Sequence, residues 1–136
     1  MLIFFNPNTI TLKHSNTAIM TLAPIKETIS FDVLDRIDVR VGTIERVDDV
    51  PGSKKLVRLT VHFGDHHRTI LAGLKQERED PQEIQGTQAL FVVNLEPKKM
   101  MGEVSEGMVF DIGYANGLAP VLAVPEAPVP NGARAG

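Results

Sequence analysis

The chain is 136 residues long, with 43% apolar residues, 23% charged residues and a formal net charge of −3. This length and composition predict one soluble globular domain around one modest core. No cysteine is present, which excludes disulfide scaffolds and thiolate metal sites. No apolar run approaches the roughly 20 residues of a membrane span, so no membrane contact is predicted. The acidic balance also disfavours a nucleic-acid-binding protein, unless the basic residues gather on one face.

Residues 1–26 are predicted to be an N-terminal tail outside the domain, which we place at residues 27–136. They show no sustained helical or strand period, and the apolar run from Leu2 to Phe5 ends at Asn6. A secretory signal would need a basic start, about 7–15 apolar residues and a small-residue cleavage site, so a cytoplasmic location is predicted. The tail could be disordered, a start-site artefact upstream of Met20, or an arm that pairs with a partner.

A helical turn and a strand are the first predicted elements of the domain. Ser30 can cap a turn over residues 31–36, and residues 39–43 then alternate as in a half-buried strand. Gly42 inside this strand predicts a bulge or sharp bend, which small barrels need at their corners. Residues 48–53 have the composition of a loop.

Short strands and turns are predicted for the rest of the chain. Residues 58–63 and 68–72 form a hairpin, with Gly64 and Asp65 in the turn. A short helix follows, capped by Asp80 and ending near Gly86. Further strands are predicted at residues 89–93, 109–112 and 121–124.

The number and order of these elements predict an all-β fold. Five or six short strands, with one short helix between the third and the fourth, are typical of the five-stranded Greek-key barrel called the OB-fold. Composition alone does not separate this fold from other small barrels.

Catalytic and metal-binding patterns are not recognisable in the sequence. No nucleophile motif, phosphate loop or dinucleotide fingerprint occurs, so the protein is predicted not to be an enzyme and to need no cofactor. His62, His66 and His67 lie around one predicted turn without a cysteine or a spaced His–Glu motif, and no metal site is predicted. A small enzyme or metal protein would become the better interpretation if zinc were bound there.

Two basic segments are candidates for contact with nucleic acid. Lys54 and Lys55 lie in a loop before a strand, where the connecting loops of an OB-fold meet oligonucleotides, although a solvated turn is the simpler interpretation. A second loop follows the strand at residues 89–93 and presents both hydrogen-bonding and cationic groups. Its candidate side chains are Asn94, Lys98, Lys99, Ser105 and Met108. Met108 could either form an apolar floor under a base or fill the core.

Aromatic residues make up only 5% of the chain. Single-strand binding by an OB-fold normally uses aromatic side chains for base stacking. The composition therefore favours recognition of a folded RNA by its shape and backbone.

Four segments, in this order, resemble the tRNA-binding domain family. They are Asp38-Val39-Arg40-Val41-Gly42, Ser53-Lys54-Lys55-Leu56, Ala72-Gly73-Leu74, and the loop from Asn94-Leu95 through Pro97-Lys98-Lys99-Met100 to Ser105-Glu106-Gly107-Met108. The family includes the C-terminal domain of bacterial methionyl-tRNA synthetases, free-standing structure-specific tRNA-binding proteins and the endothelial monocyte-activating polypeptide cytokines. The resemblance runs from about Phe31 to the C-terminus.

The resemblance implies an OB-fold, often dimeric, that binds tRNA through its folded shape. A C-terminal extension that reaches Pro130-Asn131-Gly132 is implied to build the dimer contact. Met101 stands where the family often has arginine, which removes a phosphate contact. By motif position, the implied RNA-contacting residues are Arg40, Lys54, Lys55, Asn94, Lys98, Lys99, Ser105 and Met108.

Two functions follow as hypotheses. The first is a non-catalytic tRNA-binding homodimer, acting alone or in trans to an aminoacyl-tRNA synthetase. The alternative is a chaperone that binds unfolded peptides, because a secretion-chaperone branch resembles the same family.

Overall fold

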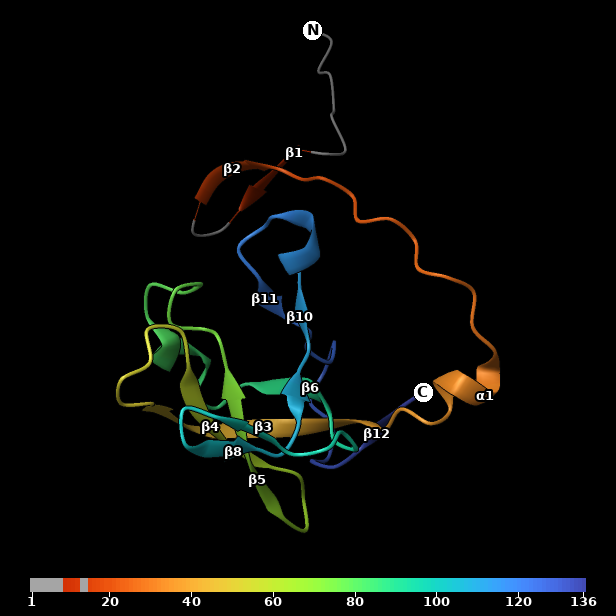
Figure 1. Cartoon of the computed structure of the whole chain (residues 1–136), viewed down its shortest axis with the longest axis vertical. Helices are drawn as coiled ribbons and strands as arrows, with labels where there is room; N and C mark the ends of the chain where they lie inside the picture. The colour runs from red at the N-terminus through yellow and green to blue at the C-terminus, as the bar shows by residue number, and fades with distance from the viewer. Residues whose placement is uncertain (1–8, 13–14) are drawn as a thin grey trace, which may run out of the picture.

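The computed structural model describes residues 9–12 and 15–136. The predicted tail lies outside these residues at 1–8 and 13–14. Within it, β1 (Thr9–Leu12) and β2 (Ser15–Ile19) pair antiparallel (Figure 1). The arm of residues 20–30 then runs around the molecule to α1 (Phe31–Leu34). The division of the chain at residue 27 stays a prediction.

Ser30 caps α1 as its sequence predicts, because its Oγ accepts a hydrogen bond from Val33 N at 3.3 Å. The helix ends at Leu34 rather than Arg36 and buries none of its residues. None of the helices described is long or apolar enough to span a membrane.

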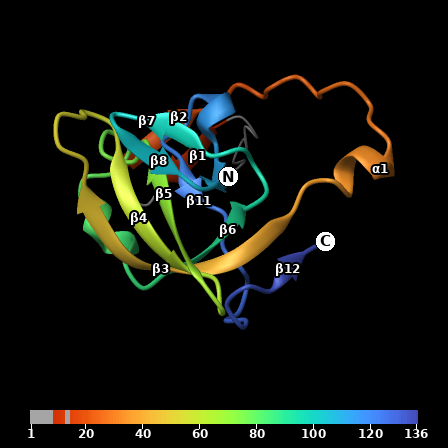
Figure 2. The ribbon, with the colours of Figure 1, turned by 60° about the horizontal axis from the view of Figure 1, so that its bottom comes forward.

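The main sheet is antiparallel and is built around one long strand, β3 (Val39–Asp49). The first half of β3 pairs with β6 (Gln88–Val92), and its second half pairs with β4 (Val57–His62). Because one strand serves two neighbours in succession, the sheet curls on itself (Figure 2). The strand order is β5-β4-β3-β6-β9, and the outer strands are β5 (His67–Ala72) and β9 (Met108–Val109).

The two ends of this sheet approach each other. Glu106 N, just before β9, donates a hydrogen bond to Thr69 O of β5 at 2.8 Å. The C-terminal strand β12 (Arg134–Ala135) pairs with the start of β3. The nearly all-β, barrel-like fold predicted from the sequence is therefore confirmed.

The prediction of a bulge at Gly42 is wrong. The register of β3 against β4 shifts between Ile44 and Arg46, whereas the β3–β6 register is regular from Val39 to Thr43. Gly42 serves close packing instead, because a Cβ there would lie 2.6 Å from Cγ1 of Val61. The strand also continues to Asp49, so the predicted loop begins later than expected.

The core follows the predicted alternation. Every second residue of β4 is buried, and Leu59 and Val61 have no solvent exposure. Phe63 and Phe91 meet edge to face with ring centroids 5.4 Å apart. Each buried aliphatic or aromatic side chain of this kind contributes about 1.5–3 kcal/mol to folding.

The predicted helix between β5 and β6 exists as a single 3₁₀ turn, η1 (Pro81–Ile84). Asp80 caps it by accepting a hydrogen bond from Gln82 N at 3.0 Å. The predicted strand at residues 109–112 is divided between β9 and β10 (Asp111–Ile112), and η2 (Tyr114–Asn116) and β11 (Val121–Leu122) follow.

A hairpin lies inside the segment that the sequence presents as one long loop. Its strands are β7 (Lys98–Met100) and β8 (Glu103–Ser105). Met101 and Gly102 form its turn with φ angles of 52° and 79°. Positive φ at both turn residues is the pattern of a type I′ turn, which matches the twist of the strands.

Candidate nucleic-acid interface

The lysine loop, defined as residues 51–56, joins β3 to β4 and has a defined shape. Ser53 Oγ accepts hydrogen bonds from Lys55 N at 3.3 Å and from Leu56 N at 2.9 Å. This serine turn leaves the side chains of Lys54 and Lys55 exposed to solvent.

The β7–β8 hairpin meets the lysine loop at one edge of the barrel. A Cβ at Gly52 would lie 3.6 Å from Cε of Met101 at the tip of the hairpin. Arg58 on β4 reaches the same hairpin, with Nη1 2.6 Å from Oε1 of Glu103. The structure therefore brings together the two basic segments, which are far apart in the sequence. We call this edge, with Lys54, Lys55, Lys98 and Lys99, the lysine rim.

The four lysines of the rim are exposed and carry uncompensated charge. None of them has a carboxylate within 4.0 Å among the residues that the structure describes. Two carboxylates near the lysine loop have other partners, since Asp48 pairs with Arg46 at 3.3 Å and Asp49 pairs with Lys75. Positive charge at this rim is thus compatible with the acidic composition of the whole chain.

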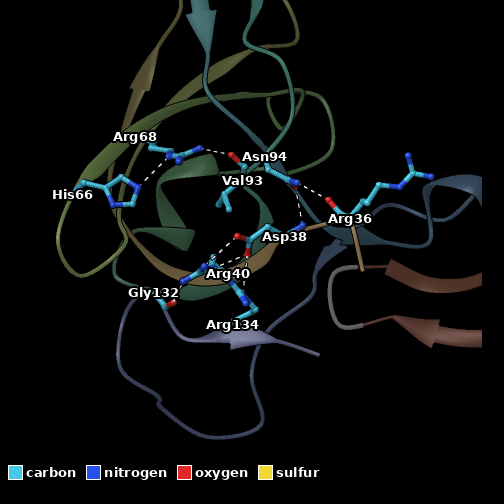
Figure 3. A network of polar contacts seen from close by, with 9 residues as sticks. All are labelled: Arg36, Asp38, Arg40, His66, Arg68, Val93, Asn94, Gly132 and Arg134. Atoms are coloured by element: carbon cyan, nitrogen blue, oxygen red, sulfur yellow. Dashed lines mark hydrogen bonds and ion pairs between the residues drawn. The ribbon is translucent and has the colours of Figure 1, made fainter. Parts of the chain in front are cut away.

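Arg40 does not belong to the rim. Its guanidinium pairs with Asp38 through Nε at 2.7 Å and Nη2 at 3.1 Å, and Nη1 donates to Gly132 O at 3.1 Å (Figure 3). The hydrogen bond from Arg40 holds the pKa of Asp38 below its usual value, and Asp38 raises the pKa of Arg40. Arg40 therefore fastens the C-terminal extension to β3.

Asn94 is also used inside the protein. Its Oδ1 accepts a hydrogen bond from Asp38 N at 2.8 Å, and its Nδ2 donates to Arg36 O at 2.6 Å (Figure 3). These two bonds join the end of β6 to the segment that leads into β3.

Ser105 is the most buried of the predicted contact residues, at 3% exposure. Its Oγ accepts a hydrogen bond from Leu71 N and donates one to Gly107 O, both at 3.0 Å. The hydroxyl attaches the hairpin to β5 and has no free hydrogen for a ligand.

Met108 is 45% exposed, so it is not core filler. It lines a cavity of about 250 Å³ between the end of β5 and the segment from β9 to β10. A separate open groove of about 560 Å³ lies beside the hairpin, between Arg58, Pro97 and Val104.

Arg68 is a residue whose role the sequence did not reveal. Its Nη1 donates to Val93 O and, at 3.1 Å, to Glu106 O, while its Nε donates to Nε2 of His66 at 3.1 Å (Figure 3). It holds both ends of the segment that carries the hairpin. No local signal could have shown this, because each acceptor except His66 is a backbone group remote in sequence.

The three histidines around the β4–β5 turn do not converge on one point. His66 is bonded to Asp65 at 2.6 Å, whereas His62 and His67 approach Glu45, with ligand atoms within 4.8 Å of one another. His62 Nδ1 accepts hydrogen bonds from Gly64 N and Asn131 Nδ2, which leaves the ring proton on Nε2. Glu45, His62 and His67 thus form a partly exposed cluster of three residues, and the absence of a metal site stays a prediction.

Comparison with known proteins assigns the chain to a family. Residues 39–134 match the family model described as "Putative tRNA binding domain". The chain belongs to the tRNA-binding domain family. The match covers strands β3 to β11, the lysine rim and the first residue of β12.

A methionine–tRNA ligase from Nitrosomonas europaea is 38% identical to this tRNA-binding domain over 122 residues. The alignment covers 90% of the chain but only 17% of the ligase.

Two solved structures resemble the domain in fold. The MetRS related protein from Pyrococcus horikoshii is 32% identical, with a TM-score of 0.70 over 81% of this chain and 99% of its own. The chaperone CsaA from Bacillus anthracis is 26% identical, with a TM-score of 0.68 over 81% of this chain and 100% of its own.

Proposed function

We infer that this domain binds folded tRNA through shape and backbone, without catalysing a reaction. The observation that carries the proposal is the lysine rim, where two exposed lysine pairs without carboxylate partners lie on segments that meet at one edge of the barrel. Exposed lysines attract a ribose-phosphate surface and release its counterions. The absence of catalysis is proposed because no nucleophile motif, phosphate loop or dinucleotide fingerprint occurs in the sequence.

The predicted contact residues divide into two groups under this proposal. Lys54, Lys55, Lys98, Lys99 and Met108 are exposed and available to RNA. Arg40, Asn94 and Ser105 act by positioning, because their polar atoms are bonded within the protein. The positioning residues keep the C-terminal extension and the hairpin in place.

Assembly as a homodimer completes the proposal. The arm of residues 20–30 and α1 expose several large apolar side chains, and they stand away from the barrel (Figure 2). The exposed side chains are Leu22, Ile25, Ile29, Phe31 and Leu34, and Ile37 follows the helix. Exposed apolar side chains of this kind are a feature of protein interfaces. The part of the C-terminal extension in a dimer contact stays a prediction. A two-fold dimer would present two lysine rims to tRNA and could act in trans to a synthetase by raising the local tRNA concentration.

The test is a gel-shift titration of tRNA at several salt concentrations. The double variants K54A/K55A and K98A/K99A are expected to bind more weakly and to lose about one unit of salt slope for each phosphate contact removed. The control is K26A/R36A, which removes two exposed cations outside the rim and is compared with the natural protein only after sedimentation shows the same oligomeric state. Unchanged affinity and slope in both rim variants would show that the rim is only solvated surface.

Peptide binding is the second candidate function. The similarity to the chaperone CsaA and the groove beside Pro97 and Val104 favour it. Binding of an unfolded peptide would depend weakly on salt, because apolar contact is not screened. Peptide binding would be favoured over tRNA binding if an unfolded polypeptide displaced tRNA and its affinity did not change with salt concentration.

A further inference from the structure

A small cavity lies next to the lysine rim and differs from it in chemistry. Its volume is about 250 Å³, and its walls are largely apolar. Leu71 and Leu74 come from β5 and the turn after it, whereas Met108 and Phe110 come from β9 and the residue that follows. Among the described residues, the charged groups in the lining are the carboxyls of Glu77 and Asp111.

One oxygen of the Glu77 carboxyl lacks a hydrogen-bond partner. Its Oε2 is buried and has no donor among the residues that the structure describes. Burial raises the pKa of this carboxyl, and the charge of Asp111 raises it further. The carboxyls of Glu77 and Asp111 are the charged acceptor groups that the cavity lining offers to a ligand with a hydrogen-bond donor.

The lip of the cavity is attached to the lysine loop. Lys75 N donates to Lys55 O at 3.0 Å, and Lys75 Nζ donates to Ser53 O at 2.7 Å. Gly73 and Leu74, immediately before Lys75, line the cavity. The cations that attract phosphate and the apolar cavity are thus held together by direct hydrogen bonds.

A nucleotide fits this combination, with its phosphate at the lysines and its flat base between apolar walls. Carboxylate oxygens accept hydrogen bonds, so they select a base edge that donates, such as the exocyclic amino group of cytosine. Uracil has no amino group and presents two carbonyl oxygens beside its one ring N–H. The carboxylates of Glu77 and Asp111 would repel these oxygens.

We propose that the cavity of Glu77 and Asp111 holds one unstacked, amino-bearing nucleobase of the RNA bound at the lysine rim. The cavity therefore adds a base preference to binding that is otherwise directed at shape and backbone. This inference rests on the proposed function, because the rim brings the RNA to the cavity.

The experiment compares short cytidine and uridine oligoribonucleotides on the full chain by fluorescence anisotropy at one salt concentration. The cytidine oligomer is expected to bind about three- to tenfold more tightly, the difference that one net hydrogen bond makes. E77M should abolish the preference and leave the salt slope for tRNA unchanged. E79M is the matched control, because it removes an exposed carboxylate outside the cavity.

A second measurement needs no variant. Cytidine monophosphate, but not uridine monophosphate, should shift the amide NMR signals of Gly73, Glu77 and Asp111. Equal binding of both oligomers with a normal tRNA salt slope would overturn the cavity proposal alone. Failure to bind tRNA at all would overturn the proposed function as well. Displacement of these signals by a lysine-containing peptide but not by the nucleotide would assign the cavity to peptides and overturn the inference.

Discussion

Asp38 is the residue at which three separate segments of the chain meet. Its carboxylate pairs with Arg40 in β3 and lies 3.5 Å from Nε of Arg134 in β12, while its backbone N–H donates to Asn94 (Figure 3). The side chain and the backbone N–H of Asp38 thus link the start of β3, the segment after β6 and the C-terminal extension. Its depressed pKa reports that the folded state favours the charged form.

Stability should depend on pH through Asp38. A carboxyl whose pKa is lower in the folded state contributes stability above its unfolded value of about 3.9, and loses it as pH falls through the folded value. D38N is therefore expected to unfold at a lower urea concentration than the natural protein at pH 7. The difference between the two urea midpoints should become smaller below about pH 4. D32N, on exposed α1, is the control, and its urea midpoint should equal that of the natural protein. A midpoint difference for D38N that is equal at pH 7 and pH 3 would contradict an electrostatic role of Asp38.

At the scale of the element, β3 determines the shape of the barrel. It serves two neighbours in turn, and Gly42 lies in the half that pairs with β6. A side chain there would meet Val61 and also Phe63, at 2.8 Å from Cε1. The glycine is needed because the curled sheet brings β4 side chains across its face.

G42A is expected to destabilise the fold by about 1–3 kcal/mol, as overpacked core substitutions do. Chemical denaturation measures this as a lower midpoint with an unchanged slope. The control is G73A, because a Cβ at Gly73 would have no atom within 4 Å and φ there is not in the left-handed region. If both substitutions have the same effect, close packing at Gly42 is not the reason for the glycine.

At the scale of the whole molecule, the barrel is well covered but the arm and α1 are not. Phe31 is 82% exposed and Leu34 is 52% exposed, although both are large apolar residues on one short helix. The arm is attached at its other end, where Asn116 Nδ2 donates to Thr21 O at 2.8 Å. An apolar segment presented in this way is suited to a second copy of the chain.

The double variant F31S/L34S is expected to shift the protein from dimer to monomer in sedimentation velocity at micromolar concentration. The physical reason is the loss of apolar area, at about 25 cal/mol per Å². D32S/D35S, on the same helical turn, should leave the sedimentation coefficient unchanged. A natural protein that sediments as a monomer would rule out the dimer independently of any RNA measurement.

The sequence by itself determined the features that depend on neighbouring residues. The alternation in β4 predicted its buried face, Ser30 and Asp80 predicted their caps, and the order of strands and turns predicted the barrel. The lysine pairs were also visible, because charge in a loop is a local property. Each of these follows from chain geometry over a few residues.

Only the tertiary structure decided what the polar side chains do. Arg40, Asn94 and Ser105 looked available to RNA, but their partners come from distant segments, such as Gly132, Arg36 and Leu71. The meeting of the lysine loop with the hairpin and the placement of Glu77 near Asp111 have the same origin. Hydrogen bonds and cavities form between residues that folding brings together, so a local pattern cannot specify them.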